Sequence, residues 1–200
     1  RFSPLVSKDF DLTFSNGRVD VSATLQNPAR SVDVARVTVK HVVSAGQGGA
    51  VLDVPGLTFG EAIQPEELSP ITLGVIANVS GTLQGRGLIN WDRRGVTSSG
   101  SFATKGMDMA AAFGPLTGLA GTIEFSDLLG LVTPPGQQVR LASVNPGMAV
   151  LDGLISYQLL PDLKAKIEGG RWPFAGGWLT LEPAILDLNQ AAERRLTFKV

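Results

Sequence analysis

The chain has 200 residues, of which 44% are hydrophobic and 18% charged, and its formal net charge is −1. This composition excludes a disordered segment, and the length is ample for a buried core. Near-neutral charge without a basic stripe excludes nucleic acid as a partner and docking on anionic headgroups by net charge. The absence of cysteine excludes disulfides, thiolate nucleophiles and cysteine-ligated metals.

The first predicted elements are a β-hairpin over residues 9–25 and a long strand over 31–43. Hydrophobic residues alternate with polar ones on both sides of Asn16 and Gly17, a pair that favours a type I′ turn. Residues 31–43 are rich in valine, and β-branched side chains favour strand over helix. The alternation slips at Ala35–Arg36, which predicts a bulge. We expect a loop at 46–49 and one helical turn at 64–70.

Residues 71–91 continue the period-two pattern that predicts strands. A turn at 92–95 follows, and further strands are expected at 96–102, 107–113, 118–125, 138–143, 148–159, 163–168, 178–186 and 194–200. A short helix is expected at 126–131, where serine and aspartate form a cap. Sequential strands joined by turns predict an all-β, antiparallel sheet with one apolar and one polar face. No apolar run approaches the roughly 20 residues of a membrane-spanning helix.

Several glycines fall on or next to the apolar side of their strands. They are Gly81, Gly85, Gly87, Gly100, Gly121 and Gly153. They mark either twist and bulges in a curved sheet or apolar space that the protein leaves unfilled. The WPFAGGW motif at 172–178 allows a similar pair of interpretations. In the first interpretation it forms an aromatic lip on a groove or contacts a partner. In the second it is a buried aromatic cluster that closes one end of the sheet.

The pattern of polar residues predicts no catalytic site, no metal site and no cofactor. His41, the single histidine, lies in the valine-rich strand without a serine or carboxylate nearby in sequence, which favours a structural role. The acidic residues are scattered and do not form a loop of alternating oxygen ligands. Gly81, Gly85 and Gly87 precede a strand, whereas a dinucleotide cradle needs a helix N-terminus.

Short motifs in a fixed order give the chain a resemblance to a known family over about 140 residues. The motifs are LTF at 57–59, IQP at 63–65, LSP at 68–70, GLINW at 87–91, SSGSF at 98–102, GPLTGLAGTIEF at 114–125, DLL at 127–129, PGQ at 135–137, VNPG at 144–147, DG at 152–153, YQ at 157–158 and WPFAGG at 172–177. In these motifs the chain resembles the C-terminal region of the YdbH family of AsmA/TamB-like bacterial envelope proteins.

The resemblance implies an elongated, strongly curved sheet that forms a taco-like groove or open sandwich, with one or two short helical turns. It implies a periplasmic part of an inner-membrane-anchored protein that carries phospholipid between inner and outer membranes. It also implies a small outer-membrane lipoprotein as a partner that adds strands at the C-terminal edge. Since the chain begins at Arg1 and ends within a strand pattern, we expect it to be a piece of a longer protein, with the anchor outside it. Residues 1–56 match less distinctly, so we expect a hairpin and long strand there and a groove domain at 57–200.

An older description of this family as dicarboxylate transporters would require convergent Arg or Lys side chains. The basic doublets, at 93–94 and 194–195, fall in a turn and at a strand start, which weighs against it.

Three functions are compatible with these observations. The leading hypothesis is a non-enzymatic lipid carrier that holds phospholipid acyl chains along an apolar groove. Its candidate lining is Leu73, Val75, Leu83, Ile89, Phe102, Ile123, Leu151, Ile155, Leu179 and Leu181. The second hypothesis is a scaffold with a filled core, which binds the lipoprotein at a sheet edge by β-augmentation. The third, a hydrolase built around His41, needs a serine or carboxylate within hydrogen-bond reach of the ring.

Overall fold

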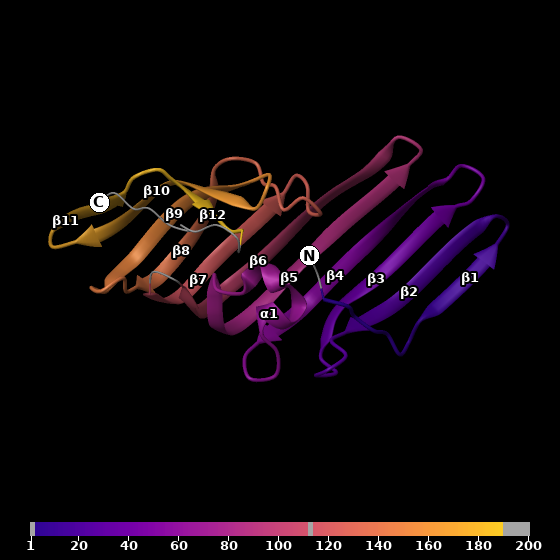
Figure 1. The fold of residues 1–200 in the computed structure, drawn as a ribbon, viewed down its shortest axis with the longest axis horizontal. Coiled ribbons are helices and arrows are strands. Elements are labelled where there is room, and N and C mark those ends of the chain that lie inside the picture. Colours follow the sequence, from indigo (N-terminus) through magenta and orange to yellow (C-terminus); the bar gives the residue numbers. More distant parts are fainter. Residues whose placement is uncertain (1–2, 112–113, 190–200) are drawn as a thin grey trace.

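Antiparallel pairing between strands that are neighbours in the sequence builds the molecule (Figure 1). The computed structural model describes residues 3–111 and 114–189. Its strands are β1 (Asp11–Ser15), β2 (Arg18–Gln26), β3 (Asp33–Val42), β4 (Gln47–Phe59), β5 (Ile76–Asp92), β6 (Gly95–Ala111), β7 (Gly114–Phe125), β8 (Gln137–Val144), β9 (Val150–Leu160), β10 (Lys164–Phe174), β11 (Gly177–Leu181) and β12 (Ala184–Asp187). Strands β1 to β11 lie in sequence order in one sheet, and β12 pairs with β10. The prediction of an all-β antiparallel sheet is confirmed.

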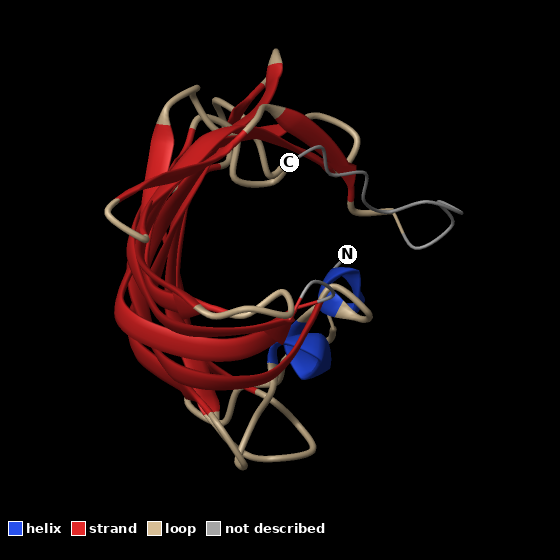
Figure 2. Ribbon diagram, turned by 90° about the vertical axis from the view of Figure 1, so that its left-hand side faces the viewer, coloured by secondary structure: helices blue, strands red, loops and turns tan. Residues whose placement is uncertain are grey.

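The sheet is open, with its first and last strands at opposite ends (Figure 1), and its strands are curved (Figure 2). Viewed along the strand order, the strands arch around a common interior that remains accessible on one side. Strands β5 and β6 are the longest, with 17 residues each. Register shifts interrupt their pairing, for example between Ala77 and Ser80, and such irregularities let long strands bend. Strand β4 crosses the division that the sequence analysis places after residue 56.

The predicted N-terminal hairpin is confirmed by its turn geometry. Asn16 and Gly17 have φ angles of 49° and 72°, and two consecutive positive values are those of a type I′ turn. The irregularity expected at Ala35–Arg36 lies one residue earlier, at Val34, where the β2–β3 register shifts.

The predicted helical turn is present as α1 (Pro65–Leu68), followed by the 3-10 helix η1 (Pro70–Thr72). Gln64 fixes this segment to β5, because its amide donates to the Val79 carbonyl (2.9 Å) and accepts from the Val79 N–H (2.8 Å). Ile63, which is fully buried, joins a core cluster with Leu57, Phe59 and Val79. The segment therefore covers one end of the sheet's apolar face.

The prediction that residues 71–75 form a strand is wrong. Pro70 starts the 3-10 helix instead, and the Leu73 N–H bonds to the Pro70 carbonyl at 3.2 Å. The Val75 N–H bonds to the Thr72 carbonyl at 3.0 Å, so the N–H groups of Leu73 and Val75 both donate within the turn and not to a neighbouring strand. Gly74, with φ 71°, redirects the chain before β5 begins at Ile76.

The helix predicted at 126–131 is also wrong, because this segment is a tight loop closed by a bridge between Asp127 and Val132. The side chain of Asp127 accepts from the Gly130 N–H at 3.0 Å, a local bond that competes with helix formation. The loop predicted at 46–49 is shorter than expected, since β4 begins at Gln47. Gly48 is a strand residue, and a Cβ there would lie 2.6 Å from the Trp91 ring.

Two other predicted boundaries change. The strands expected at 96–102 and 107–113 belong to one strand, β6, which the structure describes to Ala111. The strand expected at 178–186 divides into β11 and β12 around Pro183, which has no N–H to donate to a ladder. The strand expected at 194–200 lies outside the described residues.

Replacing Gly153 tests how closely the Trp172 ring lies on the sheet. A Cβ at residue 153 would stand 2.5 Å from Cδ1 of Trp172, whereas at Gly106 it would meet nothing within 4 Å. We expect Gly153→Ala to lower the free energy of unfolding by about 1–3 kcal/mol, the usual cost of overpacking. Urea denaturation of Gly153→Ala beside Gly106→Ala measures this difference. Equal losses in the two variants would contradict the close packing of Trp172.

Candidate lipid groove

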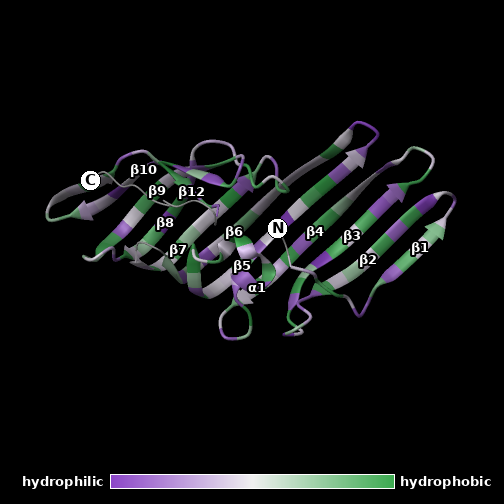
Figure 3. Cartoon of the chain, viewed as in Figure 1, coloured by the Kyte–Doolittle hydropathy of each residue, from purple (hydrophilic) through white to green (hydrophobic). Residues whose placement is uncertain are grey.

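The two faces of the sheet differ in exposure, most clearly along β5. On β5, Leu83, Gly87 and Ile89 are buried or half-buried, whereas Arg86 and Leu88 are exposed. Hydropathy alternates in the same way along the strands (Figure 3). We call the face that carries Leu83 and Ile89 the inner face. A single curved sheet shields its concave side more than its convex side, which accounts for this asymmetry.

The register aligns apolar inner-face residues from strand to strand across the sheet, since directly paired residues point to the same side. One cross-strand row runs from β1 to β6 through Leu12, Val21, Val39, Ala50, Ile89 and Ser98. A second runs from β4 to β11 through Leu57, Leu83, Thr104, Gly121, Val139, Ile155, Gly170 and Leu181. The eleven consecutive strands extend this face over about 48 Å, at ~4.8 Å for each spacing.

Seven of the ten candidate lining residues lie on the inner face. They are Leu83, Ile89, Phe102, Ile123, Ile155, Leu179 and Leu181, all half-buried within β5, β6, β7, β9 and β11. Phe102 pairs with both Gly85 and Ile123, so three neighbouring strands contribute to one stretch of the surface.

The other three candidates lie elsewhere. Leu73 and Val75 belong to the turn before β5, and Leu73 is 48% exposed. Leu151 is 56% exposed, whereas its neighbour Val150 is buried in a cluster with Trp172. The alternation is inverted at this point because Asp152 has a positive φ of 55°, which breaks the extended geometry on which the prediction depended. The placement predicted for these three residues is therefore wrong.

The inner glycines are covered by side chains from their own strand or from a neighbouring strand. A Cβ on Gly85 would lie 2.7 Å from Cγ of Phe102, and one on Gly170 would lie 2.8 Å from the Trp172 ring. Aromatic rings thus lie on the sheet where the glycines leave room, an arrangement known to support glycine in strands. The space above these glycines is occupied, and the rings form a level apolar floor.

The loop between β7 and β8 folds over part of this floor. Leu128 fills the space above two paired glycines, since a Cβ on Gly87 would lie 2.6 Å from its Cδ2 atom and one on Gly100 would lie 3.3 Å away. The buried Ser98 hydroxyl donates to Asp127 at 2.6 Å and accepts from the Leu129 N–H at 3.0 Å. The sequence analysis missed this contact because it expected a helix here.

An apolar cavity of about 210 Å³ lies at the β9–β11 end of the inner face. Its lining is Val144, Pro146, Val150, Ile155, Ile167, Trp172, Leu179, Thr180, Leu181 and Leu186. Trp172 is 5% exposed, and its Nε1 atom has no hydrogen-bond partner among the described protein groups. Close by, burial raises the pKa of Tyr157 to about 12. Both observations indicate that the Trp172 indole and the Tyr157 hydroxyl are shielded from water.

At the β1 end and near the β5–β6 turn the inner face is open. Leu12 and Phe14 on β1 are 52% and 65% exposed, and Val96, which pairs with Trp91, is 60% exposed. No second sheet covers the inner face in the part of the chain that the structure describes. The inner face is therefore an apolar surface that is exposed at β1 and is partly covered by the segment at Ile63 and the loop at Leu128.

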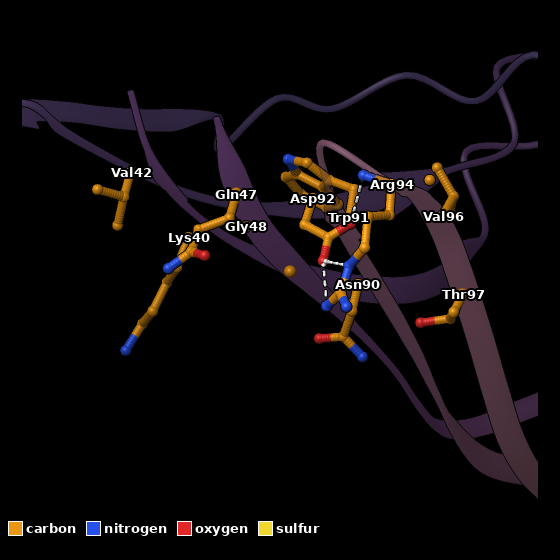
Figure 4. A pocket seen from close by; sticks show the side chains of 12 residues that line it. Lys40, Val42, Gln47, Gly48, Asn90, Trp91, Asp92, Arg94, Val96 and Thr97 are labelled. Atoms are coloured by element: carbon orange, nitrogen blue, oxygen red, sulfur yellow. Dashed lines mark hydrogen bonds and ion pairs between the residues drawn. The ribbon is translucent and has the colours of Figure 1, made fainter. Parts of the chain in front are cut away.

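A hollow of about 640 Å³ lies at the ends of the β3–β4 and β5–β6 hairpins, and most of its lining belongs to the outer face and to the turns (Figure 4). Lys40, Asn90 and Asp92, on the outer face, contribute to it together with Arg94. The Arg94 guanidinium donates to Asp92 at 3.0 Å, and Arg93 donates to the Ser44 carbonyl at 3.4 Å. Both arginines of the 93–94 doublet thus have acceptors within the protein.

His41 lies on the inner face beside Trp91. Its Nδ1 atom accepts a hydrogen bond from Trp91 Nε1 at 3.1 Å, and the two rings stack with centroids 6.0 Å apart. The recorded partner of this ring is an indole, whereas the hydrolase hypothesis needs a serine or carboxylate. Within residues 3–111 and 114–189, no group of three His, Asp or Glu side chains is placed to hold a metal ion. In the same ranges, no helix has the length and hydropathy of a membrane span.

Comparison with known proteins gives one match. The model of a family described as YdbH-like, intermembrane phospholipid transport protein YdbH, matches residues 1–200. Neither a curated protein nor a solved structure matches the chain.

Removing the Ser98 hydroxyl tests whether it holds the β7–β8 loop on the groove floor. We expect Ser98→Ala to leave the strands intact but to accelerate amide hydrogen exchange at Leu129, because the bond from that N–H to the Ser98 hydroxyl is lost. Ser99→Ala, at the paired position opposite Leu88 on the outer face, is the control. Unchanged exchange in Ser98→Ala would show that Leu128 packing alone holds the loop.

Proposed function

The chain belongs to the YdbH-like family of intermembrane phospholipid transport proteins, and from this we propose that it is a non-enzymatic module that carries phospholipid acyl chains along its inner face. We further infer that it is a periplasmic part of an inner-membrane-anchored envelope protein and carries lipid between inner and outer membranes. The observation that supports the carrier role best is the mainly apolar row across β4–β11, over which the described part of the chain places no second sheet. The seven inner-face candidates, such as Leu83, Ile89 and Ile155, would contact the acyl chains.

The dimensions of the inner face fit this role. The hydrocarbon core of a bilayer is about 30 Å thick and holds two layers of acyl chains, so one chain spans about 15 Å. A surface of about 48 Å exceeds that length roughly threefold. Each methylene that stays on the groove and out of water is favoured by about 0.8 kcal/mol. Since the lining is similar throughout, a bound chain can change position without leaving a single deep site.

A polar substitution on the inner face should weaken lipid binding more than the same substitution on the outer face. Ile89 and Leu88 are neighbours on β5 and form a matched pair. Ile89 is half-buried on the inner face, and Leu88 is 40% exposed on the outer face. We expect Ile89→Asp to retain at least about tenfold less phospholipid than Leu88→Asp, because an unpaired carboxylate against hydrocarbon costs more than about 1.4 kcal/mol. Native mass spectrometry of the purified chain after incubation with phospholipid vesicles measures the bound lipid.

A photo-crosslinking residue provides a second test that does not introduce a charge. Ile123 is half-buried on the inner face of β7, and the adjacent Thr122 is exposed on the outer face. A photo-reactive phenylalanine analogue at 123 should capture phospholipid, whereas the same analogue at 122 should not. Equal capture at both positions, or capture at neither, would contradict the carrier proposal.

The free edges of the sheet support a second candidate function, β-augmentation by a small outer-membrane lipoprotein. Among the described residues β11 pairs only with β10, and β1 pairs only with β2, so each has an edge available to a further strand. The resemblance of the chain to its family favours the C-terminal edge. A photo-crosslinker at Thr180 in β11 should then capture the lipoprotein, and one at Thr13 in β1 should not. This contact is compatible with an open groove.

A further inference from the structure

The outer face of the sheet changes in character between its middle and its C-terminal end. Over β4–β7 it carries polar pairs, including the ion pair of Arg86 with Asp53 at 2.7 Å and the hydrogen bond from Ser101 to Glu124 at 2.6 Å. Over β9–β11 it carries the indole of Trp178, 58% exposed, together with Leu154, which at 38% is about as exposed as Leu88 in the middle of the face. An exposed apolar patch on an otherwise polar face marks an interaction site.

Two arginines accompany these hydrophobic residues. Arg140, Leu154 and Arg171 are paired across β8, β9 and β10, so they form one row on the outer face. The guanidinium carbon of Arg171 stands 3.6 Å from the centre of the Trp178 ring, a cation–π contact. We call Arg140, Leu154, Arg171 and Trp178 the outer patch. Together they line a hollow of about 500 Å³.

The local charge of the outer patch is positive although the net charge of the chain is −1. Asp152 lies in the same hollow, but neither Arg140 nor Arg171 belongs to an ion pair recorded for the described residues. The patch therefore combines two cations with an indole and a leucine. Arginine binds phosphate through paired N–H donors, and tryptophan prefers the boundary between water and hydrocarbon.

We propose that the outer patch docks on the phospholipid headgroups of a membrane, with Arg140 and Arg171 contacting phosphates and Trp178 entering the interface. The WPFAGGW motif explains the position of Trp178. Ala175 and Gly176 (φ 49° and 80°) form a tight turn between β10 and β11, which places Trp178 on the edge strand of the sheet. Phe174, on the other side of this turn, is 39% exposed, but it lies on the same side of β10 as Trp172 and does not belong to the outer patch. Of the three aromatics, Trp172 is buried, and Trp178 is the one on the outer face that is available to a membrane.

The same strands carry the outer patch on one face and the apolar cavity on the other. Leu179 and Trp172 line the cavity, while Trp178 and Arg171, their neighbours in sequence, lie outside. Docking would thus bring the end of the groove that holds the apolar cavity next to a bilayer. This inference rests on the proposed lipid-carrier function, since a carrier must meet a membrane to load or release lipid.

Vesicle flotation with the purified chain tests the docking. We expect the chain to bind vesicles of phosphatidylcholine mixed with phosphatidylglycerol, and to bind vesicles of phosphatidylcholine alone more weakly. The double variant Leu154→Ser with Trp178→Ser should lose most of the binding. Leu88→Ser, a change of a similarly exposed outer-face leucine on β5, should retain it.

Arginine variants test the charge without removing apolar surface. Arg140→Gln and Arg171→Gln should each weaken binding to the phosphatidylglycerol vesicles about fivefold, with a smaller dependence on salt. Equal binding of all variants, or no binding to either vesicle, would overturn the proposal. It would also be overturned if sedimentation showed that the chain self-associates through this surface, or if only a protein partner bound there.

Lipid capture by the photo-crosslinker at 123 separates this proposal from the carrier function. Capture of lipid from detergent micelles does not require docking on a membrane. Chains with the crosslinker at 123 should therefore capture this lipid equally with and without the outer-patch substitutions. Loss of vesicle binding with unchanged capture supports the docking surface. If the chain with the crosslinker at 123 and an intact outer patch binds vesicles but captures no lipid, the carrier function is contradicted and docking remains supported.

Discussion

Covering an apolar sheet face without a second layer is the constraint on which this structure depends. Such a face is unfavourable in water, and most folds bury it under another sheet or a row of helices. Here the sheet curves around its own inner face, while a short helical segment at Ile63 and a loop at Leu128 cover parts of it. The uncovered remainder is an apolar surface suited to lipid chains, so the incomplete core and the proposed function have the same physical origin.

The lining of the groove combines small and large residues in a way that keeps it smooth. Glycines such as Gly85 and Gly170 leave gaps, and the rings of Phe102 and Trp172 lie in them. The rings therefore occupy the space that a side chain at these positions would otherwise need. A uniform apolar floor favours many positions of an acyl chain about equally, which suits passage along a surface better than binding at one deep site.

Polar interactions on the outer face contribute little to holding the sheet together. Arg86 and Asp53 form a short ion pair, but their side chains are 64% and 43% exposed, and exposed pairs of this kind stabilise by at most about 1 kcal/mol. The backbone ladder and the half-buried inner residues provide most of the stability. The outer face is consequently free to serve other contacts, and at β8–β11 it carries the arginine and tryptophan side chains proposed to meet a membrane.

The sequence by itself determined what depends on neighbouring residues. Alternation predicted the antiparallel meander and the side on which seven candidates lie, and Asn16 with Gly17 predicted a turn that the φ angles confirm. Tertiary structure decided the rest. Pro70 and Gly74 removed Leu73 and Val75 from the sheet, and the positive φ of Asp152 turned Leu151 outward. The cavity beside Trp172 and the loop over Gly87 arise from contacts between distant segments and from the bending of whole strands. A period of two residues specifies which face a side chain occupies, but it contains no information about how far the sheet curves.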